Sequence, residues 1–246
     1  MDARDRLLQA ASQLLARGGR GAVSTRAVSA VAGVQAPTIY RIFGDKDGLL
    51  DAVATLGLRN YLADKHALGE TDDPVEDLRR SWDLHVQFGL ARPAFYTLIY
   101  GEGRAQDSPA GREAYGVLCD QIARVAAAGR LRMSVDRAAR IVYAVGVGVV
   151  MSLIATPPSE RDAGLSAVIR EQVLAAVTTD AEEPPATCVG PASRAAALRE
   201  ALRTGGTTVL TAAERNLLFE WLDRIADATD TGPRPANDRP APGPRP

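Results

Sequence analysis

Apolar residues recur three or four positions apart along most of the chain, which is the spacing of one face of an α-helix. In the first fifty residues this spacing predicts a helix over about 2–17 that ends at Gly18-Gly19, a second from Ser24 to Gly33, and a short third that Gly44 ends. Asp45 is a good N-cap for a fourth helix, which runs to about residue 66. The pattern predicts an all-α fold.

Five further helices are predicted before residue 180. Asp73-Pro74 opens one that ends at Arg92-Pro93, a second carries the residues from 93 to 100, and Ser108-Pro109 opens a third that closes near residue 129. The last two cover about 135–155 and 162–178. The most apolar stretch, 141–156, falls short of the roughly 20 residues that a membrane span needs, so we expect it to be buried in protein.

The last quarter of the chain, from residue 181, departs from this regular succession. Residues 181–192 have the composition of a linker, 193–228 predict a helical hairpin, and the Pro-rich tail 229–246 is expected to be disordered. Thr211 and Glu214 form a capping box at the start of the second hairpin helix. That helix carries an apolar stripe of Leu217, Leu218, Trp221, Leu222 and Ile225. A lone hairpin cannot bury this stripe, so we expect it to dock on its own body or on a partner subunit.

Charge and cysteine usage narrow the functional class. The net charge is −1, but residues 1–66 hold nine Lys or Arg against six Asp or Glu, a local basic excess typical of a nucleic-acid-binding module. The two Cys and two His have neither metal-ligand spacing nor a disulfide framework, and the N-terminus lacks the pattern of a signal peptide. We therefore expect a cytoplasmic protein without a metal site.

Two short helices joined by a glycine turn and braced by a longer helix make a helix-turn-helix. Lys46 falls at the first position of the fourth helix, where the helix dipole disfavours a cation, so we expect a partner outside the fold to need it. Lys46 and Tyr40 can bind phosphates, Arg41 can pair with guanine and Gln35 with adenine. The alternative is that Tyr40 covers a core and Arg41 is merely solvated.

Residues 4–53 resemble the DNA-binding region of the tetracycline-repressor (TetR) family of bacterial regulators. The resemblance is carried, in the family's order and spacing, by Gly33, Thr38-Ile39-Tyr40, Phe43, Lys46 and Leu49-Leu50. It implies that 1–50 form a DNA-binding domain whose third helix is the recognition helix, with Tyr40 and Lys46 on phosphates. Gln35 and Ala36 stand where the family often has Ser and a basic residue, which affects the base pairs read. The predicted DNA-binding residues are Ser24, Thr25, Arg26, Gln35, Ala36, Pro37, Thr38, Tyr40, Arg41 and Lys46.

In 51–180, several side chains put polar atoms on helix faces that should point inward. These are Trp82, His85, Tyr96, Tyr100, Tyr115 and Cys119. They suit a mostly apolar ligand pocket with a few hydrogen-bonding groups. The alternative is a core of aromatics whose polar atoms find partners within the protein. The resemblance favours a pocket, because TetR relatives bind small effectors between these helices. For Cys119, with no flanking base or cation, we expect packing rather than reactivity.

The helix over 135–155 carries a ridge of small residues at Ala144, Gly148 and Ser152, where another helix could approach closely. Small residues also serve ordinary packing within a chain. The next helix has a stripe of Leu165, Val168, Ile169, Gln172, Val173 and Ala176. In the TetR family the corresponding helices build a four-helix bundle between subunits. We therefore expect a homodimer through 135–155 and 162–178.

These features together predict a DNA-binding transcriptional regulator, most simply a repressor that a small-molecule effector releases from a palindromic operator. The alternative is a helical ligand-binding or protein-interaction protein that keeps the fold without a specific operator. We expect no enzyme, because His66 and His85 have no visible nucleophile partner. We expect no cofactor either, since Met151 stands where a dinucleotide loop after Gly146 and Gly148 would need its third glycine.

Overall fold

The computed structural model describes residues 1–101, 109–179, 190–205 and 209–228, and the regular elements in these ranges are helices. They are α1 Ala3–Ala22, α2 Thr25–Ala32, α3 Ala36–Phe43, α4 Lys46–Ala67, α5 Pro74–Ala91, α6 Pro93–Tyr100, α7 Pro109–Ala127, α8 Val135–Ala155, the 3-10 turn η1 Pro158–Glu160, α9 Leu165–Val177, α10 Pro191–Gly205 and α11 Ala212–Ala226. One isolated bridge joins Leu131 and Thr178. The all-α prediction is confirmed. The predicted tail 229–246 and most of the predicted linker lie outside the described residues.

Local side chains set the ends of the first helices as predicted. The Ser24 hydroxyl accepts a hydrogen bond from the Ala27 N–H at 3.1 Å, and the Asp45 carboxylate accepts one from the Gly48 N–H at 2.7 Å. Gly33 and Gly44 have positive φ angles of 62° and 82°, which glycine adopts without strain. A small core then forms between α1, α2, α3 and the start of α4, with these side chains fully buried: Leu7, Leu15, Val23, Val28, Ile39, Leu49, Leu50 and Val53.

The prediction that Gly18-Gly19 end the first helix is wrong in part. Both residues leave helical geometry, with φ and ψ of −143° and 21° at Gly18 and 63° and −166° at Gly19, but one further turn follows to Ala22. Glycine permits the break, and the last turn leads directly to Val23, which is fully buried. The glycines therefore bend α1 rather than end it.

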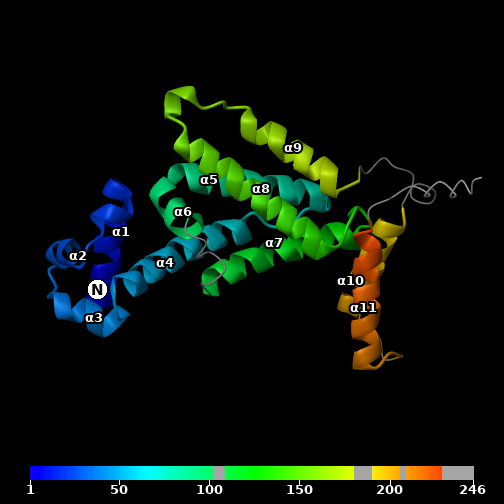
Figure 1. The fold of residues 1–246 in the computed structure, drawn as a ribbon, viewed down its shortest axis with the longest axis horizontal. Coiled ribbons are helices and arrows are strands. Elements are labelled where there is room, and N and C mark those ends of the chain that lie inside the picture. Colours follow the sequence, from blue (N-terminus) through cyan, green and yellow to red (C-terminus); the bar gives the residue numbers. More distant parts are fainter. Residues whose placement is uncertain (102–108, 180–189, 206–208, 229–246) are drawn as a thin grey trace, which may run out of the picture.

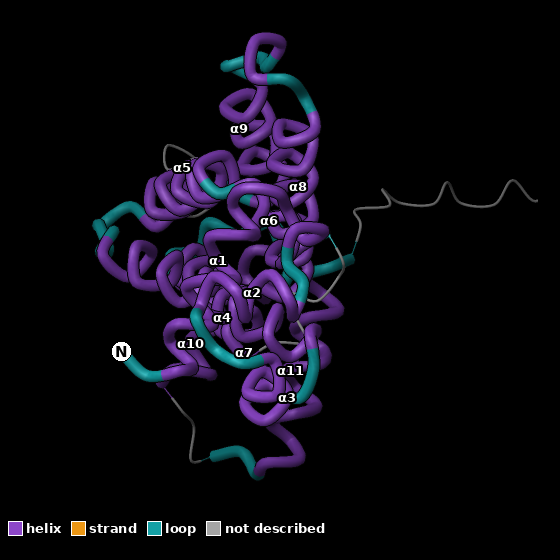
Figure 2. The backbone as a smooth tube through the Cα atoms, turned by 90° about the vertical axis from the view of Figure 1, so that its left-hand side faces the viewer, coloured by secondary structure: helices purple, strands orange, loops and turns teal. Residues whose placement is uncertain are grey.

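The remaining helices form a larger body around a second core (Figure 1). α4 passes from the first module into this body: Leu49 and Leu50 belong to the small core, whereas Leu58 and Leu62 belong to the large one. α6 also serves both, since Leu98 packs in the small core and Ile99 in the large one. The tube view shows the helices of the first module in front of the body, with no strand drawn (Figure 2). Two helices, α4 and α6, thus belong to both cores.

A buried carboxylate fastens α5 to α7 and to the loop before α5. Asp77 accepts hydrogen bonds from the Thr71 N–H and hydroxyl, from Arg80 at 2.6 Å and from Arg124 at 2.7 Å. Burial alone would raise the pKa of Asp77, but these hydrogen bonds hold it well below its usual range. The paired charge keeps α5 and α7 in a fixed relation beside the cavity described below.

α8 is 21 residues long, with a mean hydropathy of 2.0 over its most apolar window. Among the described helices it is the one that could cross a membrane by length and composition, a test that the core helix of a helical body also passes. Here it packs against α5, α7 and α9. Its other face leaves Ala144, Gly148 and Ser152 exposed in the single chain.

The predicted hairpin is α10 and α11, and the capping box at Thr211 and Glu214 is present. It lies at the end of the molecule opposite α1–α3 and packs on α7 (Figure 1). Asp227 accepts hydrogen bonds from the Ser134 N–H at 2.9 Å and the Ser134 hydroxyl at 2.8 Å, at the start of α8. The hairpin therefore docks on its own body, but only in part: the stripe buries Leu222, whereas Leu217, Trp221 and Ile225 remain exposed.

Candidate functional site

The helix-turn-helix presents one face of α3 to solvent. Ile39 is fully buried in the small core, while Tyr40, the next residue, is 53% exposed. Gln35, Pro37 and Arg41 are exposed as well. Tyr40 therefore does not cover the core, and the outer face of α3 carries polar and aromatic groups. α3 itself lies at one end of the molecule (Figure 1).

The ten predicted DNA-binding residues lie on α2 with its N-cap, on α3 with its N-cap, and at the start of α4. The exposed ones are Ser24, Arg26, Gln35, Pro37, Tyr40 and Arg41, and the half-buried ones are Thr25, Ala36, Thr38 and Lys46. The Ser24 hydroxyl already caps α2, which leaves its lone pairs less free for a ligand. Hydroxyls, amides and cations on one face are the groups that contact phosphates and base edges.

Lys46 is the first residue of α4, directly after the Asp45 cap. Its neighbour Asp47 forms an ion pair of 2.9 Å with Arg20 from the last turn of α1. This pair ties the bent end of α1 to the start of α4. It links α1 to the first turn of α4, which carries Lys46.

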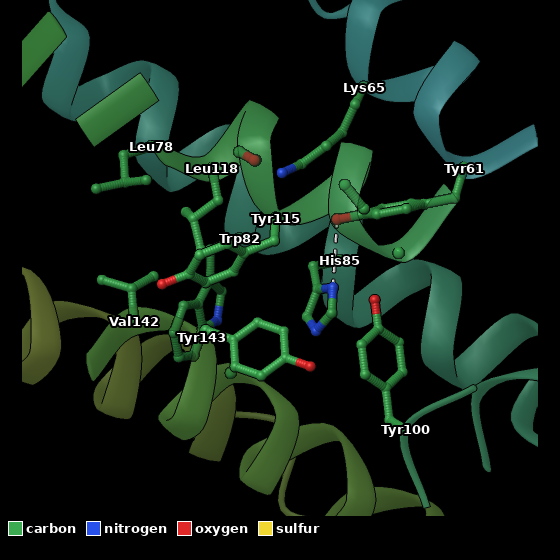
Figure 3. Close-up of a pocket in the computed structure, with 14 residues that line it drawn as sticks. Tyr61, Lys65, Leu78, Trp82, His85, Tyr100, Tyr115, Leu118, Val142 and Tyr143 are labelled. Atoms are coloured by element: carbon green, nitrogen blue, oxygen red, sulfur yellow. Dashed lines mark hydrogen bonds between the residues drawn. The ribbon is translucent and has the colours of Figure 1, made fainter. Parts of the chain in front are cut away.

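A second candidate site is a cavity inside the body, with about 570 Å³ of empty space, part of it open to solvent. Fourteen of the described residues line it, and the helices α4, α5, α6, α7 and α8 all contribute (Figure 3). The polar and aromatic ones are Tyr61, Lys65, Ser81, Trp82, His85, Tyr100, Tyr115 and Tyr143. The rest are apolar or small, so the cavity is an apolar space with a few polar groups, which is the usual composition of a small-molecule site.

His85 is held in the wall by two tyrosines. Its Nδ1 atom lies 3.2 Å from the Tyr61 hydroxyl, and its Nε2 atom lies 2.9 Å from the Tyr96 hydroxyl. Burial, together with the positive charge of Lys65, lowers the pKa of His85 to about 3. Burial raises the pKa of both tyrosines. The three groups are therefore neutral at physiological pH and act as a fixed hydrogen-bonded unit.

Trp82 and Lys65, two other polar groups of the cavity, differ in hydrogen bonding and in charge. The Trp82 ring N–H already donates to the Ser166 hydroxyl of α9 at 3.0 Å, so Trp82 offers the cavity its ring rather than a donor. Lys65 is 7% exposed, and burial lowers its pKa from 10.5 to about 8. At neutral pH it is still mainly an ammonium ion, the one charged side chain among the described residues that line the cavity.

Four of the six residues predicted to line a pocket do so: Trp82, His85, Tyr100 and Tyr115. Tyr96 does not, because it is fully buried behind His85. Cys119 does not either; it is half-buried beside Tyr115, and burial raises the pKa of its thiol. Whether any of these residues binds a ligand remains a prediction.

Sequence reasoning missed Tyr61, Lys65 and Tyr143, which complete the wall. One signal was present for two of them. Tyr61 and Lys65 continue the apolar face of Leu58 and Leu62 on α4, so a lysine stands where a core residue is expected. It is also one of two lysines in the chain. Among the described residues, no group of three or more His, Cys, Asp or Glu could hold a metal ion.

Residues 7–53 match the family model described as bacterial regulatory proteins, tetR family. A tetR-family bacterial regulatory protein from Rhodococcus RHA1 has a similar structure, with 22% identity, a TM-score of 0.56, and coverage of 73% of this chain and all of that one. The ketosteroid transcriptional regulator KstR2 of Mycobacterium tuberculosis gives 19% identity, a TM-score of 0.53, and coverage of 73% and 96%. The fatty acid degradation regulator FadR of Bacillus halodurans gives 16% identity, a TM-score of 0.58, and coverage of 71% of this chain and 95% of that one. No curated protein matches by sequence.

Proposed function

We propose that this chain, a member of the tetR family of bacterial regulatory proteins, is a dimeric repressor that releases its operator when a small molecule fills the cavity. The family and the fold support a transcriptional regulator that binds DNA. The repressor role, the palindromic operator and release by an effector are the further steps of the proposal, as is a location in the cytoplasm.

The observation that carries the proposal is the outer face of α3 with the adjoining start of α4. Arg41 and Gln35 are exposed and can reach base edges in a major groove, while Tyr40 and Lys46 can hold the phosphates on either side. The charges on this module also favour DNA, because the basic excess of the chain is confined to its first 66 residues. A helix-turn-helix of this kind reads one half-site.

A second subunit would supply the other half-site. The unpartnered face of α8 carries Ala144, Gly148 and Ser152, and the adjoining face of α9 exposes Val168, Gln172 and Ala176. Val168 is 62% exposed, although it belongs to the apolar stripe of its helix. Two copies of α8 and α9 can cover these faces as a four-helix bundle. A two-fold dimer would place its recognition helices about 34–36 Å apart, so the operator should be an approximate palindrome.

The connection between cavity and DNA runs through α4 and α6. α4 carries Lys46 at its first residue and Lys65 in the cavity wall, a separation of about 28 Å along the helix. α6 carries Leu98 in the small core and Tyr100 in the cavity wall. A ligand that favours one position of these helices changes the distance between the two DNA-binding modules. Its differential affinity for the two states sets the strength of the coupling.

The test is DNA selection from a random library, followed by binding measurements at several salt concentrations. We expect enriched sequences with an approximate two-fold repeat and an affinity that falls steeply with salt. Lys46→Ala should weaken binding to all sequences alike and reduce the slope of log K against log salt by about one. Asp64→Ala, an exposed change on the same helix, is the matched control and should leave the slope unchanged.

Weak binding without sequence preference would reject the operator and favour the alternative of a ligand-binding or interaction protein. An unchanged salt slope for Lys46→Ala would remove only Lys46 from the phosphate contacts. The two results therefore test separate parts of the proposal.

A further inference from the structure

The cavity holds a buried cation that the protein itself leaves unpaired. The Lys65 side chain points into the cavity from α4 (Figure 3). Its Nζ atom lies 5.7 Å from the centre of the Tyr61 ring, over the face of the ring. Among the described residues, no carboxylate forms an ion pair with Lys65. The contact with Tyr61 is a weak substitute for a counter-ion.

An unpaired ammonium ion in an apolar space is costly, because it loses water and gains no opposite charge. The lowered pKa of Lys65 has burial as its cause, with no opposing contribution from a nearby acid. The neighbouring His85 cannot compensate, since it is neutral and bound on both sides by tyrosine hydroxyls. The free protein therefore carries an unsatisfied positive charge at this site, which an anion would complete.

The side chains around Lys65 determine what charge and polarity the rest of a ligand must have. The rings of Trp82, Tyr115 and Tyr143 and the side chains of Leu78 and Leu118 surround it (Figure 3). Of the described carboxylates, none lines the cavity, and Lys65 is the single charged group there. A polyanion would therefore leave charges without partners, whereas one negative charge on an apolar body would not.

We propose that the cavity takes a small monocarboxylic acid, bound as its anion, with the carboxylate paired to the Lys65 ammonium and an apolar or aromatic body against Trp82 and Tyr115. The inference rests on the proposed function in one respect, namely that this acid acts as the effector. The Tyr100 hydroxyl forms no hydrogen bond with the described residues and is a second polar group that a ligand can reach. The acid and Lys65 together make a neutral, desolvated pair.

The pairing predicts how binding depends on pH. The titratable groups that face Lys65 or line the same cavity are Tyr61 on α4, His85 on α5, Tyr100 on α6, and Tyr115 and Tyr143, on α7 and α8. His85 stays neutral above pH 3, and burial raises the pKa of Tyr61, Tyr100 and Tyr115. Lys65 is thus the group that titrates near pH 8. Because the anion needs its ammonium form, affinity should fall about tenfold between pH 7 and pH 9.

The test is calorimetric titration of the full chain, without DNA, with four acids and their primary amides. The acids are benzoic, 3-phenylpropanoic, hexanoic and decanoic acid, which span aromatic and aliphatic bodies of different length. At pH 7 we expect at least one acid to bind tenfold or more tightly than its amide, and this preference to shrink at pH 9. Lys65→Met should remove the preference, whereas Arg59→Met, an exposed cation on the same helix, should preserve it.

Equal binding of acids and amides, or no binding by any acid, overturns the inference. The same holds if Lys65→Met keeps the preference for the acid. The comparison of acids with amides and the pH dependence use the unmodified protein, so they decide the matter even if a variant folds poorly. DNA binding is measured separately: operator binding without acid binding rejects only this inference, and acid binding without an operator rejects only the proposed repressor.

Discussion

Lys65 should lower the stability of the empty protein. Lowering its pKa from 10.5 to about 8 corresponds to a cost of roughly 3 kcal/mol when the side chain is charged. The cost is fully present below pH 8, where Lys65 is charged in both the folded and the unfolded chain. Between pH 8 and 10.5 the folded protein has lost this proton while the unfolded chain keeps it, so stability rises with pH and the cost is relieved. We expect Lys65→Met to raise the free energy of unfolding by roughly 2–3 kcal/mol at pH 7, and the gain to shrink above pH 8.

Chemical denaturation of both proteins at one concentration, at pH 7 and pH 9.5, checks this stability prediction. Lys46→Met, which removes the other lysine of the chain, is the matched control and should change stability by less than about 1 kcal/mol. A destabilised Lys65→Met protein would show that the lysine stem packs better than methionine and that the buried charge has a partner.

At this scale the sequence predicted which residues face inward but not which of them share a cavity. Periodicity placed Trp82, His85, Tyr100 and Tyr115 on inner faces, and they line the cavity. It placed Tyr96 equally well, yet that side chain lies behind His85. Each stripe is a local property, whereas a cavity depends on how five helices approach one another. Lys65 was overlooked because a long cationic side chain on an apolar face is usually expected to reach solvent.

At the scale of elements, Asp227 joins the hairpin to the start of α8. Its carboxylate accepts from the Ser134 N–H and hydroxyl, and Ser134 is 2% exposed. Asp227→Ala leaves those buried donors without an acceptor, so we expect a loss of about 1–3 kcal/mol in the free energy of unfolding. Asp64→Ala, at an exposed position of α4, should stay within about 0.5 kcal/mol. Thermal melts of the two variants beside the parent protein measure the difference; equal melting temperatures would mean that the Asp227 carboxylate does not hold the hairpin on the body.

Helix ends were the most predictable elements, because their signals are local. Ser24, Asp45, Thr211 and Glu214 each cap the helix that the sequence assigns to them. The bend in α1 was missed, since a pair of glycines signals a break equally well whether or not one more turn follows. The hairpin was expected, but its docking side depends on Asp227 meeting Ser134, which are 93 positions apart.

At the scale of the whole molecule, the proposed dimer depends on the outer faces of α8 and α9, which would place the two recognition helices relative to each other. The small residues of α8 are exposed in the single chain. This exposure is unusual in a helix of mean hydropathy 2.0 unless another surface covers them. The exposed face of α11, with Leu217, Trp221 and Ile225, is the competing apolar surface. A single substitution can show whether subunits meet through the faces of α8 and α9 or through the face of α11.

If subunits meet through α8 and α9 as proposed, Gly148→Arg should make the protein monomeric. A Cβ atom added at Gly148 would meet no atom within 4 Å, so the single chain tolerates the change, but a guanidinium there would stand in the middle of a bundle built from α8 and α9. Analytical ultracentrifugation should give half the parent mass, and operator affinity should fall by tenfold or more because one half-site is lost. Gly116→Arg on α7 is the control, since a Cβ there also meets no atom within 4 Å. It should remain dimeric. If Gly148→Arg keeps the parent mass, subunits meet elsewhere, and the exposed face of α11 becomes the surface to change next.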